Sequence, residues 1–523
     1  MSEDPTEASG RPGVAGSLGH SGGSTPSSPV ERPSGPNPKH GMLSGYVGLL
    51  AGLAAFLLIL LMPTPEGLSA EGQRVAAVAA LMAIWWMTEA IPLAATALLP
   101  IPLFPILGVM PVSAATAPFA HELIFLFMGG FLIALAMQRW DLHRRIALAV
   151  VATVGYQPRQ LVLGFMLATA FLSMWISNTA TTVMMLPIGI AILVLVDPDE
   201  GPLGTALMLG IAYAASIGGV ATIIGTPPNA IFAAAAGQML DRSVGFTQWM
   251  IVGVPLAVVM LAITWLLLVR VLHPLPADGG DSGAEGLIRE KRAGLGAPSR
   301  GEKVVGTVFV LTALGWLVRE PKQFGAFELP GLQTWVPLIT DSVIAMAGAL
   351  LLFLIPVSFR ERTFALNWEW AVKIPWGVLI LFGGGLSLAA GFEASGLAEW
   401  IGMQVMGLEG VPLIVLIGVV ATLFVLLTEL TSNTATATMG MPIMAGVAFG
   451  LGADPIILMA AAAMASSMAF MLPVATPPNA IVFGSGRVTI QEMTRAGLWL
   501  NILSITLVTL TAYFLLGRVF AAG

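Results

Sequence analysis

The sequence predicts an all-α polytopic membrane protein with about eleven transmembrane helices and two inverted-topology repeats, each with a re-entrant helical hairpin and a broken helix. Three observations support this fold class. First, 56% of the 523 residues are hydrophobic and only 10% are charged, whereas about 25% of residues are charged in soluble domains. Second, apolar stretches long enough to cross a bilayer recur along the chain. Third, two polar motifs inside such stretches each occur twice.

Composition also excludes several classes of function. The formal net charge is −6, so the positive surplus needed to bind phosphate backbones is missing and we expect no nucleic-acid partner. The chain has no cysteine and five histidines, which excludes thiolate chemistry and leaves little for a zinc site. No magnesium, zinc-protease or serine-hydrolase motif is visible, so we expect neither an enzyme nor an organic cofactor.

Polar segments divide the chain into four parts. The first forty residues contain seven Pro, seven Gly and eight Ser, a composition that buries too little apolar surface to fold. A second polar interruption, rich in charged side chains, lies near the middle of the chain. The predicted parts are a disordered cytoplasmic tail (1–42), a first membrane half (43–273), a cytoplasmic linker (274–303) and a second membrane half (304–523).

Basic residues in short loops predict the orientation of the chain. Three connections carry clusters of Lys and Arg, near residues 139–159, 289–303 and 360–373, and such clusters favour the cytoplasmic side. We therefore expect a multi-pass protein of the plasma (inner) membrane, surrounded by lipid bilayer, with a cytoplasmic N-terminus. Trp85 and Trp86 are predicted to be anchors at the membrane interface.

The repeat is the most informative feature. The Ser-Asn-Thr-Ala-Thr sequence that begins at Ser177 recurs at Ser432, 255 positions later, and Thr-Pro-Pro-Asn-Ala-Ile at Thr226 recurs at Thr476, 250 positions later. An odd number of crossings, about five, separates the copies, so the two copies are predicted to be upside down relative to each other. Inverted repeats of this kind are typical of secondary transporters.

Each repeat is predicted to contain two helix starts at the depth of the membrane. Polar tips inside apolar runs favour re-entrant hairpins, near residues 160–196 and 411–450, with the second arm beginning at Ser177 or Asn178 in the first copy. The paired prolines after Thr226 break a helix and suit the first turn of the next one. Four helix N-termini that converge near the midplane form a site for an anion.

The charge of such an anion must be balanced by something other than a basic side chain. No Lys, Arg or His occurs between Gln160 and Asp241 or between Ile374 and Gly486. An uncompensated anion in a medium of low dielectric constant is strongly unfavourable. Cotransported cations held by hydroxyl, amide and carbonyl oxygens supply the missing charge, and sodium suits such neutral ligands. The sequence therefore predicts sodium-coupled anion symport.

These motifs resemble the divalent-anion/sodium symporter family, the INDY-type sodium-dicarboxylate and citrate cotransporters, over residues 43–520. The Thr-Glu-Ala-Ile-Pro sequence that begins at Thr88 is also similar to that family. The resemblance implies a homodimer that imports di- or tricarboxylate anions of the succinate, malate and fumarate class together with sodium ions, by an elevator motion of a transport domain against a scaffold.

The resemblance also implies roles for individual residues. The residues expected to hold the substrate are Ser177, Asn178, Thr179, Ser432, Asn433, Thr434, Thr226, Thr476 and Pro477. The first sodium site is expected to use Ser173, Ser177, Asn178 and the carbonyl of Gly225, and the second Thr428, Thr431, Asn433 and the carbonyl of Ala475.

Several alternatives stay open at this point. A sodium-independent anion exchanger, or a permease for sulfate or another inorganic anion, has the same architecture. A sodium/proton antiporter or an arsenite-type permease is a related competitor, which buried Asp or Lys in the broken helices would favour. Glu429 is either functional or a structural partner of the second hairpin, and Glu89 is interpreted as part of the scaffold. Gly129, Gly130 and the glycines at 383–385 are expected to allow close packing.

Overall fold

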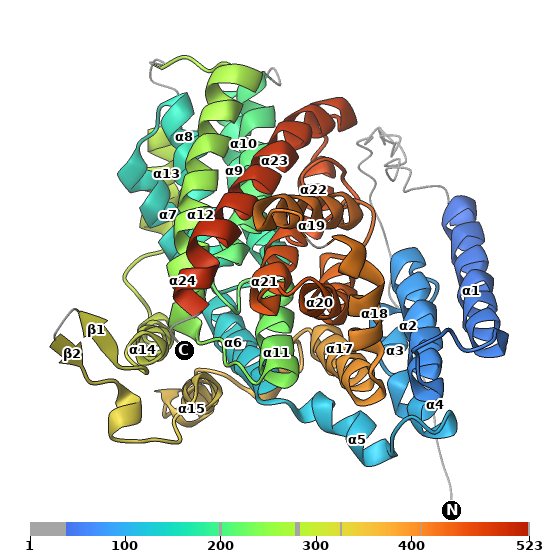
Figure 1. Ribbon diagram of the computed structural model, residues 1–523. Helices are drawn as coiled ribbons and strands as arrows, with labels where there is room; N and C mark the ends of the chain where they lie inside the picture. The colour runs from blue at the N-terminus through green and yellow to red at the C-terminus, as the bar shows by residue number, and fades with distance from the viewer. Residues whose placement is uncertain (1–37, 198–200, 278–282, 325–326, 409, 521–523) are drawn as a thin grey trace, which may run out of the picture. The chain divides into compact units, whose positions relative to one another are not determined.

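The computed structural model describes residues 38–197, 201–277, 283–324, 327–408 and 410–520 (Figure 1). The tail predicted to be disordered, residues 1–42, lies largely outside the described residues, which begin at Pro38. The described residues from Ser44 onward form one compact unit. The predicted boundaries of the linker, at residues 273 and 303, stay a prediction.

Helices joined by short turns make up the first part of the chain. Their bounds are α1 (Pro38–Leu61), α2 (Ala70–Thr88), α3 (Leu93–Thr96), α4 (Pro100–Ile106), α5 (Val112–Thr116), the 3₁₀ helix η1 (Ala117–Ala120), α6 (Glu122–Arg139), α7 (Leu142–Val154), α8 (Pro158–Ser173), α9 (Asn178–Val196), α10 (Pro202–Val220), α11 (Pro227–Leu240), α12 (Phe246–Leu266) and the π-helical η2 (Leu267–Leu272).

The second part is also helical. Its helices are α13 (Ala284–Gly294), α14 (Arg300–Leu317), η3 (Leu332–Thr334), α15 (Asp341–Leu354), α16 (Trp368–Ala371), α17 (Trp376–Ser395), α18 (Leu397–Val405), η4 (Met406–Leu408), α19 (Leu413–Thr428), α20 (Asn433–Gly450), α21 (Pro455–Ala465), α22 (Pro477–Phe483), α23 (Ile490–Thr511), η5 (Ala512–Leu516) and α24 (Gly517–Phe520). The segment predicted to be a linker thus contains α13 and the first turn of α14.

Strands are confined, in the described ranges, to two short antiparallel hairpins. Strand β1 (Lys322–Phe324) pairs with β2 (Phe327–Leu329), with Lys322 opposite Leu329. Strand β3 (Pro356–Ser358) pairs with β4 (Thr363–Phe364), with an irregular register. Six described helices are long and apolar enough to cross a membrane, and five apolar helices are shorter. The predicted all-α polytopic membrane fold is confirmed.

The sequence repeat corresponds to a repeat of helices. In the first copy, α8 and α9 form a hairpin that is followed by α10 and α11, and in the second copy α19 and α20 are followed by α21 and α22. Helices α8 and α19 begin and end at positions 255 apart. The copies differ at the helix break, because α10 continues to Val220 whereas α21 ends at Ala465. The second copy therefore has a longer non-helical segment before its Thr-Pro-Pro motif.

The two copies pack against each other through these broken helices. Helix α11 of the first copy contacts α20 of the second, and α22 of the second contacts α9 of the first. Figure 1 shows α11, in green, beside α20 and α17, in orange. This exchange brings the start of each broken helix close to the hairpin of the other copy.

The paired glycines allow helices to approach closely, as predicted. A Cβ atom added at Gly129 on α6 would lie 2.7 Å from the carbonyl carbon of Ala345 on α15. On α17, a Cβ atom at Gly384 would collide with the carbonyl of Ala97. Larger side chains at these positions would push the helices apart, so the glycines serve packing.

The prediction for the two tryptophans on α2 is wrong. Trp85 and Trp86 are buried, with 9% and 0% of their surfaces exposed. The indole N–H of Trp85 donates to the carbonyl of Leu49 on α1 at 3.2 Å, and that of Trp86 donates to the carbonyl of Leu93 at 3.0 Å. Both rings tie α2 to neighbouring segments, a role that depends on tertiary contacts and not on local composition.

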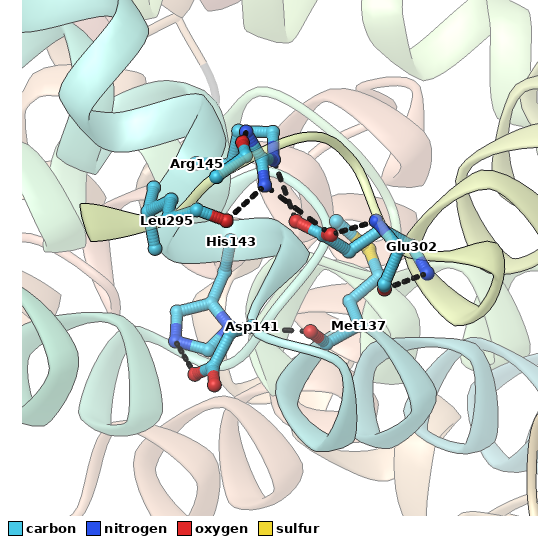
Figure 2. A network of polar contacts seen from close by, with 8 residues as sticks. Met137, Asp141, His143, Arg145, Leu295 and Glu302 are labelled. Carbon is cyan, nitrogen blue, oxygen red and sulfur yellow. Dashed lines mark hydrogen bonds and ion pairs between the residues drawn. The ribbon is translucent and has the colours of Figure 1, made fainter. Parts of the chain in front are cut away.

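A buried ion pair fixes α7 against the linker region. Figure 2 shows the guanidinium of Arg145 between the carbonyl of Leu295 and the carboxylate of Glu302. Arg145 Nε lies 2.6 Å from Glu302 Oε1, and Ser299 also donates to this carboxylate. Burial alone raises the pKa of Glu302, but the hydrogen bonds from Arg145 and Ser299 bring that pKa below its usual value. The ion pair therefore stabilises the fold at neutral pH and is lost as the pH falls through the lowered pKa.

We expect Arg145→Met to lower the free energy of unfolding by about 2–3 kcal/mol, because Glu302 would stay buried without its partner. The adjacent Arg144, which forms no ion pair or hydrogen bond in the described chain, provides the matched control Arg144→Met. Thermal unfolding of both variants in detergent without added lipid tests this. Equal melting temperatures for the two variants would show that the ion pair contributes nothing.

Candidate functional site

The hairpin tips form as the sequence predicts. Helix α9 begins at Asn178 after the N-cap Ser177, whose hydroxyl oxygen accepts a hydrogen bond from the backbone N–H of Ala180 at 3.3 Å. Helix α20 begins at Asn433 after the N-cap Ser432, whose hydroxyl makes no capping bond. Because the first N–H groups of a helix have no partner within the helix, both tips present backbone donors together with hydroxyl groups.

Neutral oxygen atoms gather around the side-chain amide of Asn178. The hydroxyl of Ser173 lies 2.7 Å from Asn178 Oδ1 and 2.6 Å from the carbonyl of Ala215. If the amide is turned over, Asn178 Nδ2 donates to the carbonyls of Ala215 at 3.1 Å and Gly225 at 3.3 Å. Four oxygen-bearing groups thus meet at one point, which we call the Asn178 cluster. The Ser173 hydroxyl has one hydrogen and donates to only one of its two oxygen neighbours, so the remaining oxygens need an N–H group or a cation.

The second hairpin contains a matching group, which we call the Asn433 cluster. The hydroxyl of Thr428 lies 2.6 Å from Asn433 Oδ1 and 2.7 Å from the carbonyl of Ser466. A second pair of hydroxyls, those of Thr431 and Thr436, is 2.6 Å apart. Thr428 and Ser173 occupy equivalent positions, and both are fully buried. Two similar sets of neutral oxygens therefore lie behind the two tips.

The helix breaks are held by a second pair of asparagines. Helix α11 begins after the N-cap Thr226 and α22 after Thr476, each with proline in the first turn. The amide of Asn229 donates to the carbonyls of Gly219, Val220 and Thr222. The repeated motif is visible in the sequence, but this role of its asparagine was not predicted, although exact duplication of the residue was a usable signal.

The equivalent amide of Asn479 donates to the carbonyls of Ala469 and Leu472. The hydroxyl of Thr226 lies 3.4 Å from that of Ser467, in the longer break of the second copy. The two breaks are therefore built alike and lie next to each other.

Glu429 stabilises the longer break. Its carboxylate accepts hydrogen bonds from the backbone N–H groups of Phe470 at 2.7 Å, Met471 at 2.9 Å and Leu472 at 3.1 Å, and from the amide of Asn501 at 2.8 Å. The early end of α21 leaves these N–H groups without helical partners.

The equivalent residue in the first copy is Met174, which contacts the break through its backbone carbonyl. The hydroxyl of Thr222 in the break donates to the carbonyl of Met174 at 2.6 Å. Of the two interpretations of Glu429, the hydrogen bonds support the structural one.

Both hairpin tips and both helix breaks line one cavity of about 1000 Å³. The residues predicted to hold substrate all lie in its lining: Ser177, Asn178, Thr179, Ser432, Asn433, Thr434, Thr226, Thr476 and Pro477. Among the residues predicted to bind sodium, Gly225, Thr431 and Ala475 also line the cavity, whereas Ser173 and Thr428 lie behind Asn178 and Asn433.

The cavity contains one unexpected carboxylate. Glu89, which follows α2, lines the cavity in a left-handed backbone conformation with φ of 48°. Glu89 was interpreted as part of the scaffold and was not expected to line the site. The described residues of the lining include no Lys, Arg or His. The polar surface of the cavity therefore consists of hydroxyls, amides, backbone groups and this single acidic side chain.

Comparisons with known proteins agree over most of the chain. Residues 43–519 match the family described as the sodium:sulfate symporter transmembrane region. The chain is 44% identical over 481 residues to the sodium-dependent dicarboxylate transporter SdcS of Staphylococcus saprophyticus, covering 90% of this chain and 91% of that protein. It is also 44% identical over 483 residues to SdcS of Staphylococcus aureus, with coverage of 90% and 91%.

A solved structure, that of the YdaH transporter of Alcanivorax borkumensis, is similar in fold. The TM-score is 0.52 at 17% identity, and the match covers 91% of this chain and 98% of that one. At this level of identity the similarity concerns the fold alone.

We expect Glu429→Gln to loosen the break between α21 and α22, because hydrogen bonds to a charged group contribute about 1.5–3 kcal/mol each and an amide presents one acceptor in place of two. Hydrogen exchange of the backbone N–H groups at residues 470–472 should become at least about tenfold faster. The control is Glu393→Gln, which removes an exposed carboxylate from α17. Unchanged exchange in the Glu429 variant would contradict the structural role.

Proposed function

The chain belongs to the sodium:sulfate symporter family, whose members are membrane transporters and not enzymes, and from this premise we propose that it imports dicarboxylate anions together with sodium ions. The SdcS relatives are named sodium-dependent dicarboxylate transporters, and the substrates that we propose for this chain are dicarboxylates of the succinate, malate and fumarate class. The observation that carries the proposal is the pair of oxygen clusters behind two polar tips, in a cavity whose described lining has no basic side chain.

Donors for the anion come from the tips. Substrate carboxylates accept hydrogen bonds from the first backbone N–H groups of α9 and α20, which carry the positive ends of the helix dipoles. The hydroxyls of Thr179 and Thr434, next to the N-cap serines, add further donors. Thr226, Thr476 and Pro477 form the adjoining wall at the helix breaks. Two tips in one cavity suit an anion with a carboxylate at each end.

Sodium ions neutralise the bound anion. The first ion is bound by Ser173, Asn178 and the carbonyl of Gly225, which belong to the Asn178 cluster, together with the N-cap Ser177. The second ion is bound by Thr428, Thr431 and Asn433, which belong to the Asn433 cluster, together with the carbonyl of Ala475. Neutral hydroxyl, amide and carbonyl ligands match a monovalent cation at a broken helix. The hydroxyls of Ser173 and Thr428 each have two oxygen acceptors within 2.6–2.7 Å but only one hydrogen to donate, so a cation serves the oxygens left without a donor.

Transport then follows from movement of the tips and breaks together. Since α11 packs on α20 and α22 on α9, the four elements shift as one transport domain past a scaffold, in an elevator motion. The two repeats have inverted orientations in the membrane, which gives the inward-facing and outward-facing states similar energies. The protein works as a homodimer in the plasma membrane with its N-terminus in the cytoplasm.

Glu89 favours dianions over trianions. Its carboxylate belongs to the cavity lining, and two unit charges about 10 Å apart interact by about 0.5–1.5 kcal/mol in media between water and a protein surface. The repulsion grows with each further negative charge on the substrate. Succinate therefore binds with a smaller penalty than citrate.

We expect Asn178→Ala and Asn433→Ala each to reduce sodium-driven uptake of labelled succinate at least about tenfold, because each removes a ligand of a charged species. Uptake into proteoliposomes under an inward sodium gradient, compared with potassium alone, is the measurement. Asn367→Ala, which removes a helix cap outside the cavity, is the control and should leave uptake unchanged.

Other outcomes of the same experiment point to the competing functions. Equal uptake with potassium would indicate a sodium-independent exchanger. Uptake of sulfate in place of succinate would indicate an inorganic-anion permease of the same architecture.

We expect Glu89→Gln to improve the apparent affinity for citrate about two- to tenfold more than that for succinate, because one repulsive charge is removed. Competition of both anions against labelled succinate uptake measures this ratio. Glu71→Gln, at the far end of α2, is the control. An unchanged ratio in the Glu89 variant would show that this carboxylate does not sense the substrate.

A further inference from the structure

A second pocket, of about 360 Å³, lies between α7, α9 and α13, away from the tips. Apolar residues of α9, such as Val183, Pro187 and Ile188, form one side of it. Two basic side chains, Arg144 of α7 and Lys291 of α13, line it as well. Because α9 is one of the apolar helices long enough to cross a membrane, the pocket combines a membrane-facing apolar wall with cationic groups. We call it the α7–α9 pocket.

The repeat explains why a pocket lies between α7 and α9 of the first copy. The equivalents of α7 and α9 are α18 and α20, which pack directly on each other through Gly402, Gly446 and Gly450. A Cβ atom at any of these glycines would collide with the backbone of the opposite helix. At the equivalent positions, 255 residues earlier, the first copy has Ala147, Ala191 and Leu195. These larger side chains prevent the same close contact, and α13 contacts both helices instead.

The basic side chains of the pocket are available to a ligand. Neighbouring arginines are paired, Arg145 with Glu302 and Arg289 with Glu285. Within the described residues, Arg144 and Lys291 form neither an ion pair nor a hydrogen bond. In the second copy the residue equivalent to Arg144 is Glu399. At this position the first copy, which has the α7–α9 pocket, therefore carries a basic side chain, whereas the second copy carries an acidic one.

His143 does not add to this charge. Its ring is largely buried, with Nδ1 3.2 Å from the carbonyl of Met137 and Nε2 4.0 Å from a carboxylate oxygen of Asp141 (Figure 2). Burial lowers the pKa of His143, and neighbouring Arg144 lowers it further, against smaller opposite effects of Met137 and Asp141. The imidazole is therefore neutral at pH 7, and Arg144 and Lys291 are the cations that face the pocket.

We propose that the α7–α9 pocket binds an anionic phospholipid of the surrounding bilayer, with its phosphate between Arg144 and Lys291 and an acyl chain along Val183, Pro187 and Ile188. A phosphodiester supplies a negatively charged partner for these two side chains. An acyl chain covers the apolar wall, where 52% of the surface of Val183 is exposed. Free phosphate has the charge but not the apolar part. A zwitterionic lipid has the apolar part but adds a cation next to two others.

The test is direct lipid binding by the full chain purified in detergent. Native mass spectrometry counts phosphatidylglycerol and phosphatidylcholine retained from mixed micelles of the two lipids. We expect a preference for phosphatidylglycerol that falls about fivefold for Arg144→Gln or Lys291→Gln and about 25-fold for the double variant. The control is Arg289→Gln with Arg292→Gln, which removes equal charge from the same surface helix without touching the pocket lining.

Three results would overturn the proposal. In the first, the control variant loses as much phosphatidylglycerol as the pocket variants. In the second, the unmodified chain retains the two lipids equally. In the third, inorganic phosphate displaces phosphatidylglycerol. The last would assign the pocket to free phosphate. A steric variant, Ala191→Phe, fills the apolar side without changing charge and should also reduce retention, provided that the variant elutes as a single species. Binding is measured without transport, so its outcome is independent of the function proposed for the central cavity.

Discussion

The structure depends on one constraint, that backbone groups released by a broken helix in an apolar interior must find partners inside the protein. The first break meets it with the amide of Asn229, which donates to the carbonyl of Thr222, and with the hydroxyl of Thr222, which accepts from the N–H of Gly225. The second break is longer and meets it with Asn479 and the carboxylate of Glu429. Without these contacts neither α11 nor α22 would start at a fixed position beside the hairpins.

The same constraint produces the site. Once the breaks are fixed, carbonyl groups that a continuous helix would use internally are free to face the hairpins, as the carbonyl of Gly225 does toward Asn178 and that of Ser466 toward Thr428. The polar groups that hold the fold are thus the ones that surround the cavity. The cavity is therefore polar although its described lining has no basic side chain. In the function that we propose, charge balance is left to ions that arrive with the substrate.

Local chemistry made much of this predictable from sequence. Ser177 and Thr226 are good N-cap residues, and proline fits the first turn of a helix well, so the starts of α9 and α11 follow from a few adjacent residues. The repeat then indicated that the second copy is built alike. Residues whose surroundings come from distant segments were not predictable in this way. Trp86 is buried by packing of α2, Glu89 reaches the cavity because of a turn after α2, and Glu429 meets N–H groups about forty residues later in the chain.

The most direct test of the account is equilibrium binding of succinate to the purified protein, measured by titration calorimetry in sodium and in potassium at equal ionic strength. We predict binding in sodium and none in potassium, because the described lining of the cavity has no basic side chain to offset the dianion. Binding of equal strength in both salts would contradict it, since the helix N-termini and hydroxyls would then suffice without a bound cation.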